Sequence, residues 1–356
     1  MNSMGQPQHK AEARRGDQPP IGELCVIGHP SRLGGADTEL DHQIHCWQAM
    51  GAIVHVCHTG PLDDNLRSMN LEQRGCVYHE PRDWASVKGL HCISFCNGEY
   101  LKNLPEIKRY ARSTSWVNCM TWNFDLEIEM HAKGLIDFHL YQTPHGYARV
   151  GGSLRDLANY RPLLFEPYFH ADEFPFRESR PRDKFRFGRI SRSDPDKFGR
   201  RQLWIYETMT APVLKEGLIL GWDHRIEAKL GKPEAYIKAL PEGALRQQEF
   251  YEFCDAVIMT SDTFENLPRV GFEAMASGCV LVVDNRGGWP RLVDDGATGW
   301  LCADDREFVY KASRCAFEHG ERDAMRHRAR EKLQRHWGLE NSMESWARVF
   351  TAWAEL

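Results

Sequence analysis

Two glutamates around a predicted helix start, Glu265 and Glu273, are the residues of this sequence best placed to do chemistry. They lie in the segment Asp262–Gly278, where Pro268 suits the first turn of a helix and Gly278 the position just past its end. The free N–H groups of a helix start bind anions, and carboxylates accept hydrogen bonds from hydroxyl groups. A ligand with hydroxyls on both sides of a diphosphate, a nucleotide sugar, fits this arrangement. Two solvated surface glutamates fit it equally well.

A basic run, Arg177–Arg201, holds ten Lys and Arg against four Asp and Glu. Within it, Arg189 and Lys197 lie at or after the predicted strand Phe185–Ile190, where doubly wound sheets bind ligands. Fixed cations at this place would neutralise a diphosphate and stabilise it as a leaving group. A solvated linker would show the same charges. We expect no nucleic-acid partner, because the run lacks interleaved aromatic residues and the chain has a net charge of −5.

A glycine-containing loop, His29–Asp37, follows the first predicted strand. Gly34 and Gly35 would let the backbone come close to a ligand. The glycine spacing does not match a dinucleotide fingerprint, and no Lys-Ser or Lys-Thr pair follows as in a P-loop. The loop therefore argues against a dehydrogenase and against a nucleoside triphosphatase.

Strands and helices that alternate along the chain must position these residues. The first unit is predicted as the strand Leu24–Gly28, the helix Thr38–Met50 and the strand Ile53–Cys57, the building block of a parallel doubly wound sheet. Further strands are predicted at Leu90–Phe95, Val117–Thr121, Ile136–Tyr141, Phe185–Ile190, Leu218–Gly221, Ala256–Thr260 and Val280–Asp284. The fold class is therefore α/β.

The chain of 356 residues is long enough for two domains. The four prolines in Pro162–Pro181 predict that this segment connects them. We expect a disordered leader over residues 1–20, an N-terminal domain over 21–175 and a C-terminal domain over 176–340. Residues 341–356 carry apolar side chains on one helical face and form the last helix.

Several segments in this order resemble the retaining GT-B enzymes of the "glycosyl transferases group 1" family, over about residues 22–355. Glu265 and Glu273, with seven residues between them, are similar to that family's E-x7-E signature, and the E-A-M-A-S-G that starts at Glu273 is its usual continuation. The other similar segments are Gly34–Glu39, Pro167–Phe174, Phe187–Lys197 and Asn285–Leu301.

The resemblance implies two Rossmann-like domains that face each other across a cleft, an acceptor-side N-terminal domain and a C-terminal domain that binds the nucleotide sugar. The last helix would cross back onto the first domain. It implies that Glu265 contacts the transferred sugar, Glu273 the ribose, and Arg189 and Lys197 the diphosphate. It places the remaining donor contacts at Gly34, Gly35, Asn266 and Leu267. The nucleotide-diphosphate sugar is the co-substrate, and no other cofactor and no metal are implied.

The sequence departs from the family where many relatives carry a histidine near the transferred sugar. Trp122 stands at the matching position, followed by Asn123. His145 and Asp37 are the nearest candidates for an acid–base or sugar-contacting role. For each of them a packed or capping polar residue is the simpler explanation.

The sequence gives little support to a metal site or to membrane contact. The Asp194-Pro195-Asp196 turn lies inside the basic run, and no His/Cys cluster has the paired spacing of a zinc site. The first 20 residues lack the apolar core of a secretory signal, so we expect free thiols and a cytoplasmic location. Weak peripheral membrane contact through Lys108, Arg109 and Arg112 stays open.

These observations predict a retaining, metal-independent glycosyltransferase that moves a sugar from a nucleotide-diphosphate sugar to an unidentified acceptor hydroxyl. Two alternatives stay open. The chain would bind a nucleotide sugar without catalysis, or it would be a nucleotide-sugar epimerase of GT-B fold.

Overall fold

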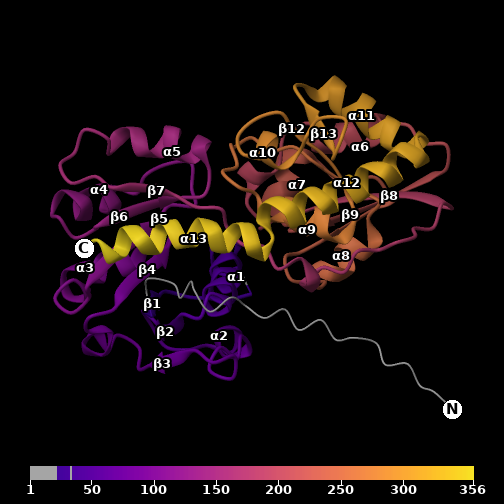
Figure 1. Cartoon of the computed structure of the whole chain (residues 1–356). Helices are drawn as coiled ribbons and strands as arrows, with labels where there is room; N and C mark the ends of the chain where they lie inside the picture. Colours follow the sequence, from indigo (N-terminus) through magenta and orange to yellow (C-terminus); the bar gives the residue numbers. More distant parts are fainter. Residues whose placement is uncertain (1–21, 33) are drawn as a thin grey trace, which may run out of the picture.

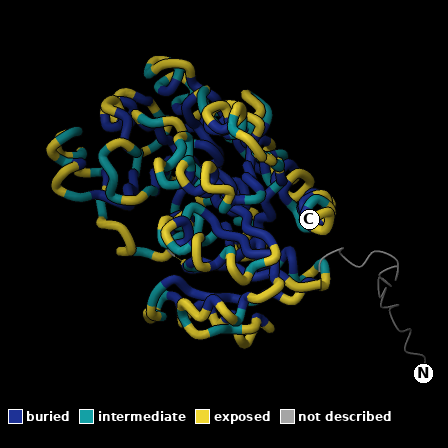
Figure 2. The backbone as a smooth tube through the Cα atoms, turned by 90° about the vertical axis from the view of Figure 1, so that its left-hand side faces the viewer, coloured by how far each residue is buried: buried dark blue, intermediate teal, exposed yellow. Residues whose placement is uncertain are grey.

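The computed structural model describes residues 22–32 and 34–356, and the predicted leader over residues 1–20 lies outside these ranges. The described chain forms two α/β domains side by side, each built on one parallel sheet (Figure 1). Buried residues run through the interior of both domains, and exposed residues follow the peripheral loops (Figure 2).

The N-terminal domain holds a seven-stranded sheet in the order β3-β2-β1-β4-β5-β6-β7. Its strands are β1 Glu23–Ile27, β2 Ile53–Cys57, β3 Val77–His79, β4 His91–Phe95, β5 Ser113–Val117, β6 Phe138–Tyr141 and β7 Pro162–Leu164. Its helices are α1 Gly35–Ala49, α2 Asp64–Ser68, α3 Gly98–Ile107, α4 Asp125–Ala132 and α5 Pro144–Val150, with short 3₁₀ turns η1 Trp84–Val87, η2 Gly151–Ser153 and η3 Ala171–Glu173.

The C-terminal domain holds a six-stranded sheet in the order β10-β9-β8-β11-β12-β13. Its strands are β8 Lys184–Ile190, β9 Leu214–Leu220, β10 Ile237–Leu240, β11 Ala256–Met259, β12 Val280–Asp284 and β13 Trp300–Cys302. The helices are α6 Gln202–Thr208, α7 His224–Leu230, α8 Gln247–Phe253, α9 Arg269–Ser277, α10 Trp289–Leu292, α11 Asp305–Phe317 and α12 His319–Trp337, with the 3₁₀ turn η4 Pro195–Lys197. The last helix, α13 Leu339–Ala354, packs on the N-terminal domain.

In both sheets the strand order reverses beside the first strand of the domain. The reversal lies between β1 and β4 in one domain and between β8 and β11 in the other. In doubly wound sheets, ligands bind in the crevice at the carboxyl ends of the strands at such a point. The predicted α/β fold with two Rossmann-like domains is thus confirmed.

Two of the predicted elements differ from the structure. The strand expected over Val117–Thr121 is β5, Ser113–Val117, which ends where the prediction began. Two of its buried polar side chains have partners: Ser113 Oγ lies 2.6 Å from His91 Nδ1, and Thr114 Oγ1 donates to the Leu135 carbonyl at 2.7 Å. The connector expected over Pro162–Pro181 begins with the short edge strand β7, where proline is tolerated.

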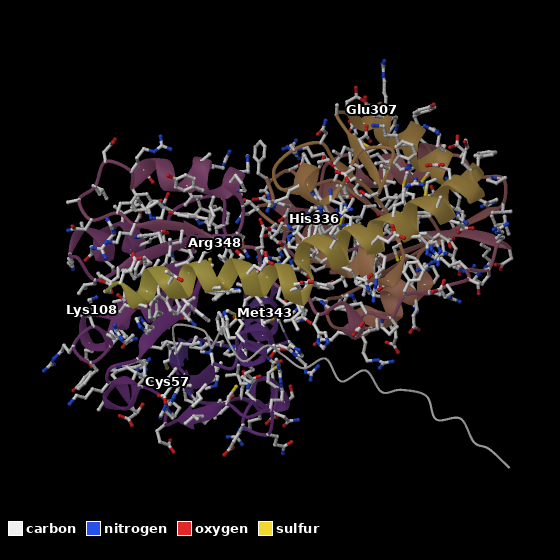
Figure 3. The ribbon with its side chains drawn as sticks, viewed as in Figure 1. Cys57, Lys108, Glu307, His336, Met343 and Arg348 are labelled. Atoms are coloured by element: carbon white, nitrogen blue, oxygen red, sulfur yellow. The ribbon has the colours of Figure 1, made fainter. Side chains whose placement is uncertain are left out.

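The last two helices tie the domains together. α12 packs on the C-terminal domain, and α13 continues over the N-terminal one; His336 lies where the two domains meet, and Met343 and Arg348 lie on α13 (Figures 1 and 3). Trp346 of α13 packs edge-on against Trp47 of α1 at 4.9 Å, and its Nε1 donates to Gln43 Oε1 at 2.9 Å. The chain therefore crosses between the domains twice, which fixes one against the other.

Candidate active site

A cavity of about 590 Å³ lies between the two domains at the carboxyl ends of both sheets. On the N-terminal side it is lined by residues that follow β1, β4, β5 and β6. On the C-terminal side it is lined by residues that follow β8 and by residues from the end of β11 to the start of α9. Both reversals of strand order therefore open onto one space.

Most of the residues expected to bind a donor line this cavity. They are Gly34, Gly35, Lys197, Glu265, Asn266 and Leu267. Lys197 Nζ lies 2.8 Å from each carboxylate oxygen of Glu265, and the two side chains are 25% and 15% exposed. The cavity thus holds an ammonium and a carboxylate in contact, the pair of charges that a phosphate and a sugar hydroxyl would respectively engage.

The glycines of the first loop come close to the other domain. Gly34 has φ +85°, a conformation that favours glycine. A Cβ on Gly35 would lie 3.4 Å from Cγ of Arg269, the first residue of α9. The N-terminal loop therefore faces the start of the very helix that the sequence predicts as an anion site.

The start of α9 differs slightly from the prediction. Pro268 is the N-cap and the helix begins at Arg269, while Gly278 ends it in the left-handed conformation. Pro268, Arg269 and Val270 all line the cavity. The positive end of this helix is therefore available to an anion in the cavity.

Arg189 does not lie at the cavity, where the sequence predicted that it would contact the diphosphate. Its side chain is fully buried and outside the cavity lining. The guanidinium donates to Gln202 Oε1 at 2.8 Å, to the Thr260 carbonyl at 3.0 Å and to the Lys197 carbonyl at 2.5 Å, and it lies 3.7 Å from the centre of the Phe198 ring. Burial lowers the pKa of Arg189 to about 10. Arg189 therefore supports the loop that carries Lys197.

Arg192 is the cation that the sequence reading missed. It lies two residues after β8, lines the cavity and is exposed. Its charge opposes the effect of burial, which raises the pKa of Asp37 to about 6. The basic run was recognised in the sequence, but which of its arginines leaves the strand and faces the cavity depends on where β8 ends.

Glu273 also lies behind the cavity, not in it. It is buried in α9, and its Oε2 accepts a hydrogen bond from the Tyr251 hydroxyl at 2.7 Å. Burial raises its pKa. The two glutamates thus do not face one space as the spacing predicted, because Glu273 faces the packed interior between α8 and α9.

Of the three residues considered for an acid–base or sugar-contacting role, only one lies at the cavity. Asp37 lines the cavity, whereas Trp122 and His145 do not. Trp122 is 53% exposed, and His145 is exposed at the start of α5. Within the described ranges, no group of three or more His, Cys, Asp or Glu side chains could hold a metal ion.

Hydrogen bonds join the two domains directly at the cavity wall. Asn266 Nδ2 donates to Gln142 Oε1 at 3.1 Å, and the Thr143 hydroxyl donates to Asn266 Oδ1 at 2.8 Å. Arg269 Nη2 donates to His42 Nδ1 at 2.9 Å. The pKa of His42 falls to about 4 because of burial and the nearby Arg269 charge, so His42 is neutral and able to accept.

Comparisons with known proteins agree with this architecture. Residues 240–332 match the family described as "Glycosyl transferases group 1". A stretch of 54 residues is 37% identical to spore coat protein SA of Bacillus subtilis; this stretch is 15% of the chain and only 14% of that protein.

Solved structures match almost the whole chain. HepE of Anabaena, solved in complex with UDP-glucose, has a TM-score of 0.70 and 15% identity, over 93% of this chain and 99% of its own. Sucrose-phosphate synthase of Thermosynechococcus elongatus has a TM-score of 0.72 and 13% identity, over 93% and 98%. A glycosyltransferase of Rickettsia africae has a TM-score of 0.70 and 12% identity, over 94% and 99%. The fold is GT-B, and together with the family match it supports a nucleotide-sugar-dependent glycosyltransferase.

Proposed function

We propose that this protein transfers a sugar from a nucleotide-diphosphate sugar to an acceptor hydroxyl, with retention of configuration and without a metal ion. The observation that carries the proposal is the interdomain cavity in which Lys197, Glu265 and the start of α9 meet the glycine loop. The diphosphate would lie against Lys197, Arg192 and the α9 N-terminus, and the sugar against Glu265 and Asn266.

In the reaction, the bond between the anomeric carbon and the leaving diphosphate oxygen breaks while the acceptor oxygen bonds to the same carbon. The acceptor proton passes to the leaving phosphate oxygen. Lys197 and Arg192 stabilise the negative charge that develops on the diphosphate. Both oxygens of Glu265 are engaged by Lys197. This contact supports a role for Glu265 in holding the sugar and argues against a role as the attacking nucleophile.

A thermal-shift panel of UDP-, GDP-, ADP- and dTDP-sugars tests donor binding, since a bound ligand raises the apparent stability. Donor consumption is then followed with and without an acceptor panel, and the anomeric configuration of the product is read by NMR. Turnover without acceptor to an epimer indicates the epimerase, and binding without turnover indicates the silent binding protein. Inversion of configuration would contradict retention.

Metal independence has its own experiment. The charges that would offset the diphosphate come from Lys197, Arg192 and a helix start, so we expect activity to survive EDTA. Complete loss that Mn²⁺ or Mg²⁺ restores would contradict this part of the proposal.

The cytoplasmic location and the weak peripheral membrane contact stay predictions. All eleven cysteines are free thiols, which supports a reducing, cytoplasmic location. None of the helices in the described ranges is long and apolar enough to cross a membrane. In the basic patch proposed for peripheral contact, Lys108 is already paired with Asp137. Sedimentation with anionic vesicles would test whether Arg109 and Arg112 suffice.

A further inference from the structure

The carboxylate of Glu39 is an unexplained feature of the cavity wall. Glu39 lies in the second turn of α1, lines the cavity and is 2% exposed. Its Oε2 accepts a hydrogen bond from Gln142 Nε2, whereas its Oε1 is buried without a hydrogen-bond partner among residues 22–32 and 34–356. An unmatched buried carboxylate oxygen is costly, because it has lost its water and gained nothing in exchange.

The orientation of Glu39 is set by Gln142 of its own domain, which is in turn bonded to the other domain. Gln142 donates to Glu39 through Nε2 and accepts from Asn266 Nδ2 through Oε1, so its amide cannot turn round without losing both bonds. Asn266 is in turn fixed by the Thr143 hydroxyl and is the neighbour of Glu265. The chain of bonds therefore connects Glu39 to the part of the cavity that also holds Glu265.

The other acidic side chains of the cavity already have partners. Glu265 contacts Lys197, Glu99 contacts Lys102, and Asp37 accepts from the Ser31 hydroxyl at 3.4 Å. Of the four, Glu39 is the one with a buried oxygen that has no partner among the described residues. Burial raises its pKa to about 7 against the opposing effects of Arg269 and Gln142. In its ionised form, this oxygen is free to accept from a hydrogen-bond donor that arrives with a ligand.

The position of Glu39 indicates which part of the ligand would donate to its free oxygen. The cations Lys197 and Arg192 belong to the C-terminal domain, so a diphosphate is held on that side, while Glu39 belongs to the N-terminal domain. A carboxylate repels an anion but accepts from a hydroxyl. Resting on the proposed function, we propose that Glu39 binds a hydroxyl of the transferred sugar and thereby determines which nucleotide sugars the protein uses.

The test compares Glu39→Gln with the wild type by calorimetry. The probes are the nucleotide sugar of the UDP, GDP, ADP and dTDP panel that binds the wild type best, and the corresponding nucleoside diphosphate. We expect Glu39→Gln to weaken binding of the nucleotide sugar about tenfold or more and to leave the nucleoside diphosphate unchanged, since a hydrogen bond to a charged group has gone. Equal weakening of both ligands, or of neither, would overturn the inference.

Donor analogues that lack one hydroxyl identify the partner without a mutation. We expect one deoxy-sugar nucleotide to bind the wild type with the same reduced affinity that the parent nucleotide sugar has for Glu39→Gln. The affinity of this deoxy analogue should not fall further in Glu39→Gln. If, for every analogue, the binding free energy lost through the missing hydroxyl and that lost through Glu39→Gln add in full, a direct contact would be contradicted. This series on the wild type also decides the matter if Glu39→Gln does not fold.

The matched control is Glu173→Gln. Glu173 also lies at the domain junction, where it accepts from His42 at 3.3 Å, but it does not line the cavity. We expect this variant to bind both probes like the wild type. If no nucleotide sugar binds the wild type, the proposed function itself fails; if one binds and Glu39→Gln matches the wild type, only the role of Glu39 fails.

Discussion

Lys197 Nζ lies 2.8 Å from both carboxylate oxygens of Glu265, although the two residues are 68 positions apart in the chain. Lys197 ends the turn η4, and Glu265 lies in the loop before α9. The contact is partly buried and lies in the wall of the cavity. It therefore places one cation where it can serve a diphosphate and a sugar-binding carboxylate at the same time.

Replacing Lys197 by methionine should remove this shared cation. We expect kcat/KM to fall by about 100-fold or more, because charge that develops on the diphosphate loses its closest stabilising group. Steady-state kinetics and calorimetry with the nucleoside diphosphate measure the effect. Lys184→Met, which breaks an ion pair with Glu216 away from the cavity, is the control and should leave both values unchanged. Wild-type kinetics in Lys197→Met would reject the site.

Arg189 in β8 and Arg192 just after β8 should behave differently. Arg189→Met removes three hydrogen bonds from a buried charged group and leaves the Lys197 carbonyl without its donor, so we expect a loss of stability of about 3 kcal/mol or more. Arg192→Met should leave the stability nearly unchanged and weaken binding of the nucleoside diphosphate. Thermal unfolding and calorimetry on both variants separate the roles. A stable Arg189→Met that has lost diphosphate binding would restore the assignment first made from the sequence.

The buried Glu39 should make stability depend on pH. Its pKa rises from an ordinary 4.5 to about 7 on folding, so the folded state holds a proton that the unfolded state has released. Stability from this group is therefore complete below about pH 4.5 and is lost as the pH rises through 7, at most about 3 kcal/mol.

Glu39→Gln removes that titration. We expect the difference in Tm between Glu39→Gln and the wild type to be more positive at pH 8 than at pH 5. Since Asp37 titrates in both proteins, its contribution cancels in this comparison. A Tm difference that stays constant over this range would show that Glu39 has an ordinary pKa in the folded protein.

The last helix should be essential for stability through Trp346. Trp346→Ala removes a fully buried ring and its bond to Gln43, and we expect a loss of about 3–5 kcal/mol. Denaturant unfolding gives the value. Arg348→Ala, on the exposed side of the same helix, should change stability by less than about 0.5 kcal/mol (Figure 3). Similar losses in both variants would contradict the packing seen here.

Local patterns were sufficient for much of the fold. The first strand, the helix that follows it and the second strand lie close to their predicted bounds, because apolar spacing and a glycine at the helix end are local signals. The helix before Gly278 and the amphipathic last helix were predicted for the same reason. The strand β5 is displaced in the prediction, since it begins with polar residues, and the partners of buried Ser113 and Thr114 are distant in the chain.

The sequence by itself determined the class of the fold and the chemical character of the site: a helix start, a basic run, a glycine loop and two glutamates. Only the tertiary structure decided which side chains meet. Arg189 and Glu273 point into packed interiors, whereas Arg192 and Glu39 line the cavity. The contacts of Glu39 with Gln142, and of Gln142 with Asn266, join residues more than 100 positions apart. No local pattern encodes such contacts, because the direction of a side chain depends on where each strand ends and on how the two domains pack.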